Sequence, residues 1–323
     1  MDARPMNHWR ITLELEGPYA TPFVSGTLFG QMCWAKLRRE GTRALETWLA
    51  PIREKAEVLL LSDVLPRGLL PRPLLPPPPF DPARAAQHKK LKKKPFVRRE
   101  AFLAARHDLG PDSFSEKDLA DAPEEKPTRR PHNVIDRLRG TVRDEAGLFF
   151  VDEWWPKLVD EQGRPTPDRL RDLYLATTLP IEPIIELLRA VGAWGFGRDS
   201  SWGRGRFLVE RYEAEHELFA HSGNRWLSLS HGCWTDELEE PRYRLATHFG
   251  KLAIEAGMAC GRPWKRPILL MKPGSTFAAR GPGPFGKWLE GIVHSEVPGI
   301  LGYTPGHHAF HLVVPYTERS HGR

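Results

Sequence analysis

Cysteine is scarce in this sequence, and long apolar runs are missing. The 323 residues include three cysteines, Cys33, Cys233 and Cys260. So small and odd a number cannot form the disulfide framework of a secreted domain, and it favours a reducing compartment. No apolar run reaches the ~18 residues of a membrane-spanning helix, and the N-terminus has no apolar signal segment. We therefore expect a cytoplasmic protein that is neither secreted nor membrane-bound.

The most informative segment lacks the residues of the common nucleotide-binding motifs. Residues 195–205 (GFGRDSSWGRG) contain four glycines and two arginines but no lysine, which excludes a Walker A loop. The segment follows a helical pattern and precedes a strand, the reverse of a dinucleotide-binding fingerprint. Glycine allows close backbone approach to a ligand, bare amides can face an anion, and arginine binds phosphate as a planar fork. The segment predicts a loop that holds a phosphate chain; the alternative is an ordinary glycine-rich turn.

Basic residues are concentrated in two stretches. The chain has a net charge of +6, yet residues 84–100 alone carry eight basic residues, Lys92, Lys93 and Lys94 among them, against one glutamate. Residues 126–143 carry six more against a single aspartate. Such concentrated charge favours a polyanionic partner. The alternative for the lysine run is a solvated, disordered loop.

Hydrophobic periodicity predicts an α+β protein with two domains. Strands are expected at residues 8–16, 57–64, 147–155, 170–178 and 206–213, and helices at 25–39, capped by Ser25, and at 181–191. The order β-α-β, insertion, β-β-α-β with one extra hairpin strand is typical of a ferredoxin-like domain, with helices on one face of the sheet and a ligand on the other. We assign this domain to residues 1–215 and expect the Pro-rich, basic insertion at 82–131 to be partly disordered.

The second half is predicted as a degenerate ferredoxin-like, or RRM-like, domain over residues 216–323. Strands are expected near residues 225–230, 243–249, 267–271 and 309–315, with a short helix at 285–293.

Five motifs, in this order, resemble the RAMP superfamily of CRISPR proteins. They are SGTLFG at 25–30, LSDVLP at 61–66 leading to LPRP at 70–73, HNVIDR at 132–137 before GLF at 147–149, the glycine-rich loop, and KPGSTF at 272–277. Within the superfamily the likeness is greatest to the fourth subunit of the type III-A (Csm) effector complex, and it spans roughly residues 8 to 315. The resemblance implies two ferredoxin-like domains, no catalysis and no cofactor. The implied partners are the 5′ handle of the crRNA, the large polymerase-cyclase subunit and the first backbone RAMP subunit.

In this interpretation the loop contacts the RNA handle directly. Its backbone amides and serines meet phosphates and sugars, its arginines neutralise charge, and its tryptophan stacks on a base. The residues are Gly197, Arg198, Ser200, Ser201, Trp202, Gly203 and Arg204. The alternative for Trp202 is packing beneath the loop.

Further RNA contacts are expected outside the loop. Asn133 is suited to a base edge and Arg137 to a phosphate, although Asp136 and Arg137 could instead form an internal salt bridge. In the family an inserted hairpin, or thumb, often wedges between handle and guide, and the insertion at 82–131 is its expected position. The remaining predicted RNA-binding residues are His132, Arg139, Lys92, Lys93, Lys94, Ser25, Lys272 and Ser275. For Ser25 the alternative is tight packing of its helix at Gly26 and Gly30.

Three other functions remain open. An endoribonuclease of the same superfamily would use His132 or His8 as a general acid or base, but here 118 residues follow the loop, whereas processing enzymes carry theirs near the C-terminus. A metalloenzyme would use His307 and His311 with His231 and Cys233, yet no established ligand motif accompanies them. A general single-strand RNA-binding module would be expected to show an aromatic RNP1 signature, which is absent.

Overall fold

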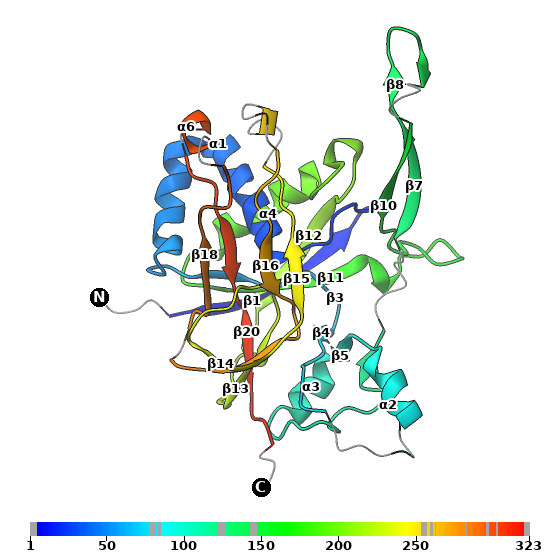
Figure 1. Ribbon diagram of the computed structural model, residues 1–323. Helices are drawn as coiled ribbons and strands as arrows, with labels where there is room; N and C mark the ends of the chain where they lie inside the picture. Colours follow the sequence, from blue (N-terminus) through cyan, green and yellow to red (C-terminus); the bar gives the residue numbers. More distant parts are fainter. Residues whose placement is uncertain are drawn as a thin grey trace.

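The structure is a computed structural model with a mixed α/β fold made of several small antiparallel sheets (Figure 1). It describes residues 5–77, 82, 85–121, 127–142, 147–252, 257–258, 261, 263–281, 283–294, 297–301 and 303–319. Cys260 lies outside these residues. No helix in the described part is both long enough and apolar enough to cross a membrane.

The first sheet has the strand and helix order predicted from the sequence. Its strands lie in the order β12-β1-β11-β2, and β3 pairs with β11 beside β2. The elements are β1 Asn7–Leu15, α1 Ser25–Arg53, β2 Leu59–Leu61, β3 Leu65–Pro66, β11 Leu170–Thr177, α4 Ile181–Trp194 and β12 Phe207–Ala214. Apolar side chains at alternate strand positions, such as Ile11, Leu13 and Leu173, form one core with Leu28 of α1 and Leu188 of α4.

Helix α1 differs from its prediction at both ends. It runs past residue 39 to Arg53, and the backbone leaves helical geometry only at Gly41, where φ is 83° and ψ is 174°. Its N-cap is Val24, so the expected capping by Ser25 is wrong. The Ser25 amide instead donates to Asp63 Oδ1 at 3.0 Å, so a carboxylate from beyond β2 satisfies the start of the helix.

The second face of the first sheet is covered, contrary to the expectation that it would hold a ligand. Tyr174 and Ala176 of β11 are buried in a second core, where they meet Leu227 and Val314 from the C-terminal half and Phe102 from the insertion. The sequence of β11, LRDLYLAT, is buried along almost its whole length because both its faces are covered.

The insertion is folded over residues 85–121, although its composition favoured partial disorder. Three strands form the sheet β4-β5-β6, flanked by two short helices. They are β4 Leu69–Pro71, α2 Ala85–Lys92, β5 Phe96–Arg98, α3 Arg99–Ala105 and β6 Leu119–Ala120. Val97, Phe102 and Leu109 are fully buried, and this apolar core explains the order.

A hairpin projects from the molecule beyond the insertion, at the upper right of Figure 1. Strand β7 Thr128–Asn133 pairs with β10 Leu148–Glu153, and the shorter β8 Ile135–Asp136 pairs with β9 Thr141–Val142 nearer the tip. Only the first few residues of this hairpin fall within the segment 82–131 in which a thumb was expected.

The C-terminal half is a group of antiparallel sheets. A four-stranded sheet has the order β14-β17-β13-β20, and β15-β16 and β18-β19 form two-stranded sheets. The strands are β13 Arg225–Ser228, β14 Leu238–Arg242, β15 Leu245–His248, β16 Ile268–Met271, β17 Thr276–Ala279, β18 Gly286–Leu289, β19 His307–Phe310 and β20 Val313–Tyr316, and α6 spans Val297–Leu301. The helix expected at 285–293 is wrong, because β18 lies there. A second ferredoxin-like domain is not confirmed.

The two halves meet where α1 begins. A Cβ atom added to Gly26 would lie 2.5 Å from His307 Nε2 and 2.6 Å from the His308 carbonyl oxygen, whereas one added to Gly30 would meet nothing within 4 Å. Gly26→Ala is therefore expected to destabilise the protein by about 1–3 kcal/mol through overpacking.

Gly30→Ala is the matched control, because both positions lie in α1. It is expected to be neutral or stabilising by up to ~1 kcal/mol, since alanine favours the helix. Chemical denaturation measures both free energies of unfolding. Equal stability of Gly26→Ala and the wild type would contradict the close packing.

Candidate RNA interface

The glycine-rich loop after α4 is closed by contacts with the protein itself. The amide of Phe196 donates to the Gly205 carbonyl at 2.8 Å, and the Gly205 amide donates to the Pro18 carbonyl at 2.9 Å. A Cβ atom at Gly205, where φ is 69°, would lie 2.2 Å from the Phe196 carbonyl oxygen. Glycine is required here so that two parts of the loop can pack together.

Five backbone amides of the loop, which were expected to face an anion, donate hydrogen bonds within the protein instead. The amide of Arg198 donates to Thr21 Oγ1 at 2.9 Å. The amides of residues 202–205 donate to carbonyl oxygens of Asp199, Ser200 and Pro18. These donors are satisfied inside the protein, so the loop is a preformed support for its side chains.

Trp202 presents its ring to solvent at the end of a stack of three rings. Its side chain is 62% exposed, which argues against packing beneath the loop. The His132 ring stacks on Trp202 with centroids 5.3 Å apart, and on Phe149 with centroids 5.4 Å apart. The structure thus brings the loop and the hairpin together.

A buried carboxylate that the sequence analysis missed fixes the hairpin to the loop. Glu153, at the end of β10, is fully buried, and its Oε1 accepts a hydrogen bond from Arg204 Nε at 2.9 Å. Its Oε2 lies 3.3 Å from Arg130 Nε. Both guanidinium groups lie over the Trp155 ring: that of Arg204 is 5.6 Å from the ring centroid and that of Arg130 is 4.5 Å from it. A glutamate within the apolar run GLFFVDEWW was the available signal, because a buried carboxylate requires cationic partners.

The other loop arginine also contacts the hairpin. Arg198 Nη2 donates to the Asp152 carbonyl at 2.9 Å, and its Nε lies 3.4 Å from Asp199 Oδ2. Ser201 and Gly203 are exposed beside Trp202, and Ser200 is half-buried.

The tip of the hairpin carries exposed basic and apolar residues. Asn133, Arg137 and Arg139 are exposed, and Leu138 between the arginines is 99% exposed. Asp136 Oδ1 accepts the amides of Leu138 at 2.9 Å and Arg139 at 3.3 Å. The carboxylate of Asp136 therefore shapes the turn.

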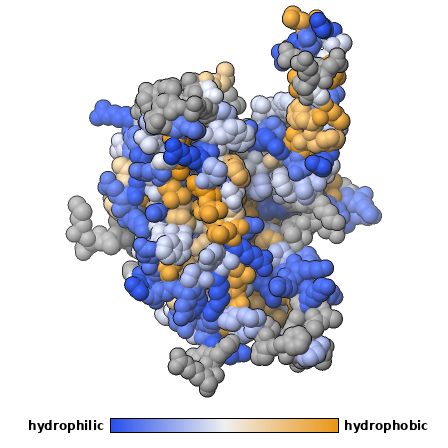
Figure 2. Space-filling view, in the orientation of Figure 1, coloured by the Kyte–Doolittle hydropathy of each residue, from blue (hydrophilic) through white to orange (hydrophobic). Residues whose placement is uncertain are grey.

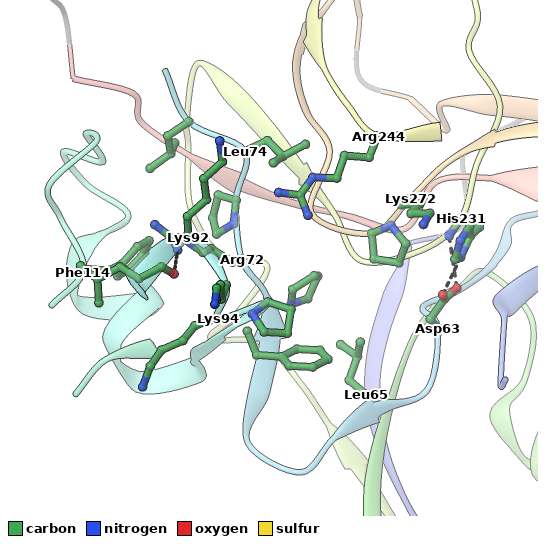
Figure 3. Close-up of a pocket in the computed structure, with 18 of the residues that line it drawn as sticks. Asp63, Leu65, Arg72, Leu74, Lys92, Lys94, Phe114, His231, Arg244 and Lys272 are labelled. Carbon is green, nitrogen blue, oxygen red and sulfur yellow. Dashed lines mark hydrogen bonds and ion pairs between the residues drawn. The ribbon is translucent and has the colours of Figure 1, made fainter. Parts of the chain in front are cut away.

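A basic groove of about 1270 Å³ lies between the insertion and the C-terminal half (Figure 3). Lys92 and Lys94 from the insertion lie on one side. Arg244, just before β15, and Lys272, just after β16, lie on the other. The basic residues that line it are Arg72, Lys92, Lys93, Lys94, Arg171, Arg244, Lys272 and His231; the acidic ones are Asp63 and Asp112. The predicted residues Lys92, Lys93, Lys94 and Lys272 therefore share one cavity.

Arg72 and Arg244 were missed as site residues, although Arg72 lies in the LPRP motif. Burial, together with the nearby charge of Arg244, lowers the pKa of Arg72, which stays protonated at neutral pH. Two arginines that line one concave site and sense each other's charge favour an anion there.

Two predicted residues lie inside the protein. Ser25 and Ser275 are fully buried. The Ser25 hydroxyl donates to the His231 carbonyl at 3.4 Å, and the Ser275 hydroxyl donates to the Lys272 carbonyl at 2.6 Å. Both hydroxyls support residues that line the groove and do not reach its surface, which corrects their assignment as RNA contacts.

The groove and the loop share one segment of chain. Tyr19, Phe23 and Val24 line the groove, while Thr21 accepts the amide of Arg198. Tyr19 also stacks on Trp154, next to the root of the hairpin, with centroids 5.6 Å apart and planes 7° apart. The groove, the loop and the hairpin root therefore adjoin one another along residues 19–24.

The histidines considered as metal ligands or general bases make other contacts. His311 Nδ1 lies 2.8 Å from Ser228 Oγ and its Nε2 lies 3.1 Å from the Cys233 carbonyl. His8 stacks on Phe219, with centroids 4.2 Å apart. Among the described residues, no three or more His, Cys, Asp or Glu side chains are grouped so that they could hold a metal ion.

Solved structures share this fold over nearly the whole chain, whereas no family model and no curated protein sequence matches it. A chain in the crystal structure of a Csm1-Csm4 cassette in complex with cA4 has a TM-score of 0.61 and 16% identity, covering 98% of this chain and 100% of that one. A chain in the same kind of cassette with pppApA has a TM-score of 0.56 and 17% identity, with 98% and 100% covered. For a Csm3-Csm4 subcomplex of the type III-A CRISPR-Cas interference complex the values are 0.55 and 14%, with 96% and 99% covered. The likeness expected from the motifs is confirmed at the level of the fold.

The ion pair between His231 and Asp63 at the edge of the groove makes stability depend on pH. His231 Nδ1 lies 2.6 Å from Asp63 Oδ2. Burial alone would lower the pKa of His231, but the charge of Asp63 and its hydrogen bond outweigh burial and raise it. The stabilisation is therefore complete below the ordinary histidine pKa of ~6.5 and is lost as pH rises through the raised pKa.

The stability difference between the wild type and His231→Gln is accordingly expected to be larger at about pH 6 than at about pH 9, by roughly 1.4 kcal/mol for each pKa unit. Urea denaturation at both pH values measures it. Groups that do not sense the charge of His231 cancel in this difference, whereas His248, whose pKa that charge lowers, contributes with it. In the Asp63→Asn background only burial acts on the pKa of His231, so the difference should shrink or change sign. A difference that stays larger at pH 6 in that background would contradict the assignment.

Proposed function

We propose that this chain is a non-catalytic RNA-binding subunit of a type III CRISPR-Cas effector complex. Within that class it is a Csm4-like subunit, which holds the 5′ handle of the crRNA and anchors the large polymerase-cyclase subunit to the backbone subunits in antiviral defence. The fold likeness over 96–98% of the chain supports the class. The basic groove is the observation that carries the RNA-binding role.

The groove suits an RNA backbone in both charge and size. Each nucleotide brings one phosphate charge, and the groove offers Arg72, Arg244 and Lys272 besides the lysine run at 92–94. Of its two acidic residues, Asp63 is paired with His231. Its volume of about 1270 Å³ exceeds the ~300–1,000 Å³ of sites for small molecules. A short single strand of several nucleotides fits these properties.

The handle continues from the groove to the ring stack in this proposal. Residues 19–24 connect the two regions, and the exposed face of Trp202 offers a platform for a base. Stacking on such a ring is worth about 1–3 kcal/mol per base. The hairpin at 128–153, with Arg137 and Arg139 at its tip, takes the position of the thumb that was expected within residues 82–131.

The partners follow from the complexes in which the similar folds occur. Those chains belong to Csm1-Csm4 and Csm3-Csm4 assemblies. We extend the same two kinds of partner, a large subunit and a backbone subunit, to this chain. The domains at residues 1–215 and 216–323 also belong to the proposal: the first sheet ends with β12 at Ala214, and the next strand begins at Arg225.

The groove assignment predicts a specific loss of affinity and of salt dependence. Arg72→Ala combined with Arg244→Ala is expected to weaken binding of a labelled handle RNA at least tenfold. The salt slope should flatten by about 0.7 for each phosphate that the variant no longer neutralises. Fluorescence anisotropy over a range of salt concentrations measures both quantities.

The matched control replaces two arginines that lie elsewhere, Arg189 on α4 and Arg280 beyond β17, which pair with Glu186 and Glu239. These changes should leave affinity and slope unchanged. Equal effects of the two double variants would contradict the groove. Equal binding of a scrambled RNA would favour a general single-strand binder, and metal-independent cleavage that disappears in His132→Ala would favour the endoribonuclease.

Trp202 is predicted to contribute by stacking. Trp202→Ala should weaken handle binding by about 5- to 150-fold, the equivalent of 1–3 kcal/mol, while leaving the salt slope unchanged, because stacking neutralises no phosphate. Trp202→Phe should recover most of the affinity. The same anisotropy measurement decides: a flattened slope, or no rescue by phenylalanine, would contradict stacking.

A further inference from the structure

The β15-β16 ribbon exposes an apolar outer face. It is extended by a bridge between Lys251 and Trp264. Its inner residue Leu270 is buried against Cys233 and Ala309. The large outer side chains, which we call the ribbon patch, are 51–63% exposed: Leu245, Phe249, Trp264 and Leu269. Figure 2 shows an apolar region over β15 and β16 on the face turned to the viewer.

The outer face of the ribbon carries apolar side chains where polar ones are usual. An antiparallel sheet that packs one face on a core normally places polar side chains on the other. Here Leu269 lies opposite Thr247 in the register, with Leu245 and Phe249 two residues to either side of Thr247. A contiguous group of exposed apolar side chains marks an interaction site.

The charged residues on the two chain segments that form the ribbon are all basic. Residues 243–252 and 263–272 contain five basic residues and no aspartate or glutamate. Arg244, Lys251, Arg266 and Lys272 are exposed around the patch, while the Lys265 ammonium donates to the Gly306 carbonyl at 3.3 Å. A complementary surface is therefore apolar in its centre and acidic at its edge.

The aliphatic half of the patch favours a protein over RNA. Leu245 and Leu269, two of its four residues, have no π face on which a base could stack, whereas RNA-binding surfaces rely on aromatic platforms. An apolar centre with charges at the rim is the usual arrangement of a protein-protein interface.

We propose that the ribbon patch is the docking surface for a folded protein partner whose own surface is apolar and edged with carboxylates. The proposal rests on the proposed function, because the partner is another protein subunit of the same effector complex. It assigns a location for this contact, which adjoins the groove through Arg244 and Lys272.

The test uses the full-length chain with its own large subunit and its own backbone subunit, each purified separately. Leu269→Glu is expected to weaken binding to one of the two subunits by about tenfold or more, as for a central interface residue. Lys251→Glu combined with Arg266→Glu should weaken the same binding, because it places like charges opposite carboxylates. Both variants should bind handle RNA as the wild type does. Biolayer interferometry measures the first two effects and anisotropy the third.

Leu208→Glu is the matched control, since Leu208 is a 50% exposed leucine on β12. It should bind both subunits normally, and thermal unfolding should show all variants folded. The proposal is overturned if Leu269→Glu binds both subunits like the wild type, or no worse than Leu208→Glu. Loss of RNA affinity in Leu269→Glu, or wild-type self-association that this change abolishes, would also overturn it. A wild type that docks through the ribbon patch but ignores handle RNA would retain this inference and refute the proposed RNA role.

Discussion

The carboxylate of Asp63 holds together three segments that are far apart in the sequence. Its Oδ1 accepts the Ser25 amide at the start of α1 at 3.0 Å and the His231 amide, 168 residues away, at 3.2 Å. Its Oδ2 binds the His231 ring. A negative charge at a helix N-terminus and an ion pair with a half-buried histidine act together here. Because Asp63 and His231 both line the groove, the contact that joins the two halves also fixes the groove's wall.

The carboxylate of Glu153 fixes the hairpin to the loop, just as that of Asp63 joins the two halves of the chain. Its buried carboxylate binds Arg204 of the loop and Arg130 of the hairpin. Arg204, which was expected to neutralise phosphate, therefore serves largely to position the hairpin. In the proposal, Arg72 and Arg244 of the groove neutralise phosphate instead. Ligand-facing side chains thus stand on supports that are already satisfied, which limits the entropy lost when RNA binds.

Periodicity located the first sheet and α4 because those patterns are local: alternate residues such as Ile11 and Leu13 face one core. What the sequence alone did not reveal depends on contacts between distant residues. The described part of the insertion is folded because Val97 pairs with Leu70 of β4, a contact that composition does not reveal. Arg72 and Arg244 line one groove only in the folded chain. Gly286, with φ of 84°, lies against the backbone of β19, so β18 forms where a helix pattern was read.

The central claim is that the groove and the adjoining loop hold the 5′ handle of a crRNA. Photo-crosslinking in the reconstituted effector complex tests it most directly, with a crRNA that carries 4-thiouridine at single handle positions. The account predicts crosslinks to this chain at groove peptides containing Arg72 or Arg244 and at loop peptides containing Trp202. Handle crosslinks found only on other subunits, or only on the far face of α1 and α4, would contradict it.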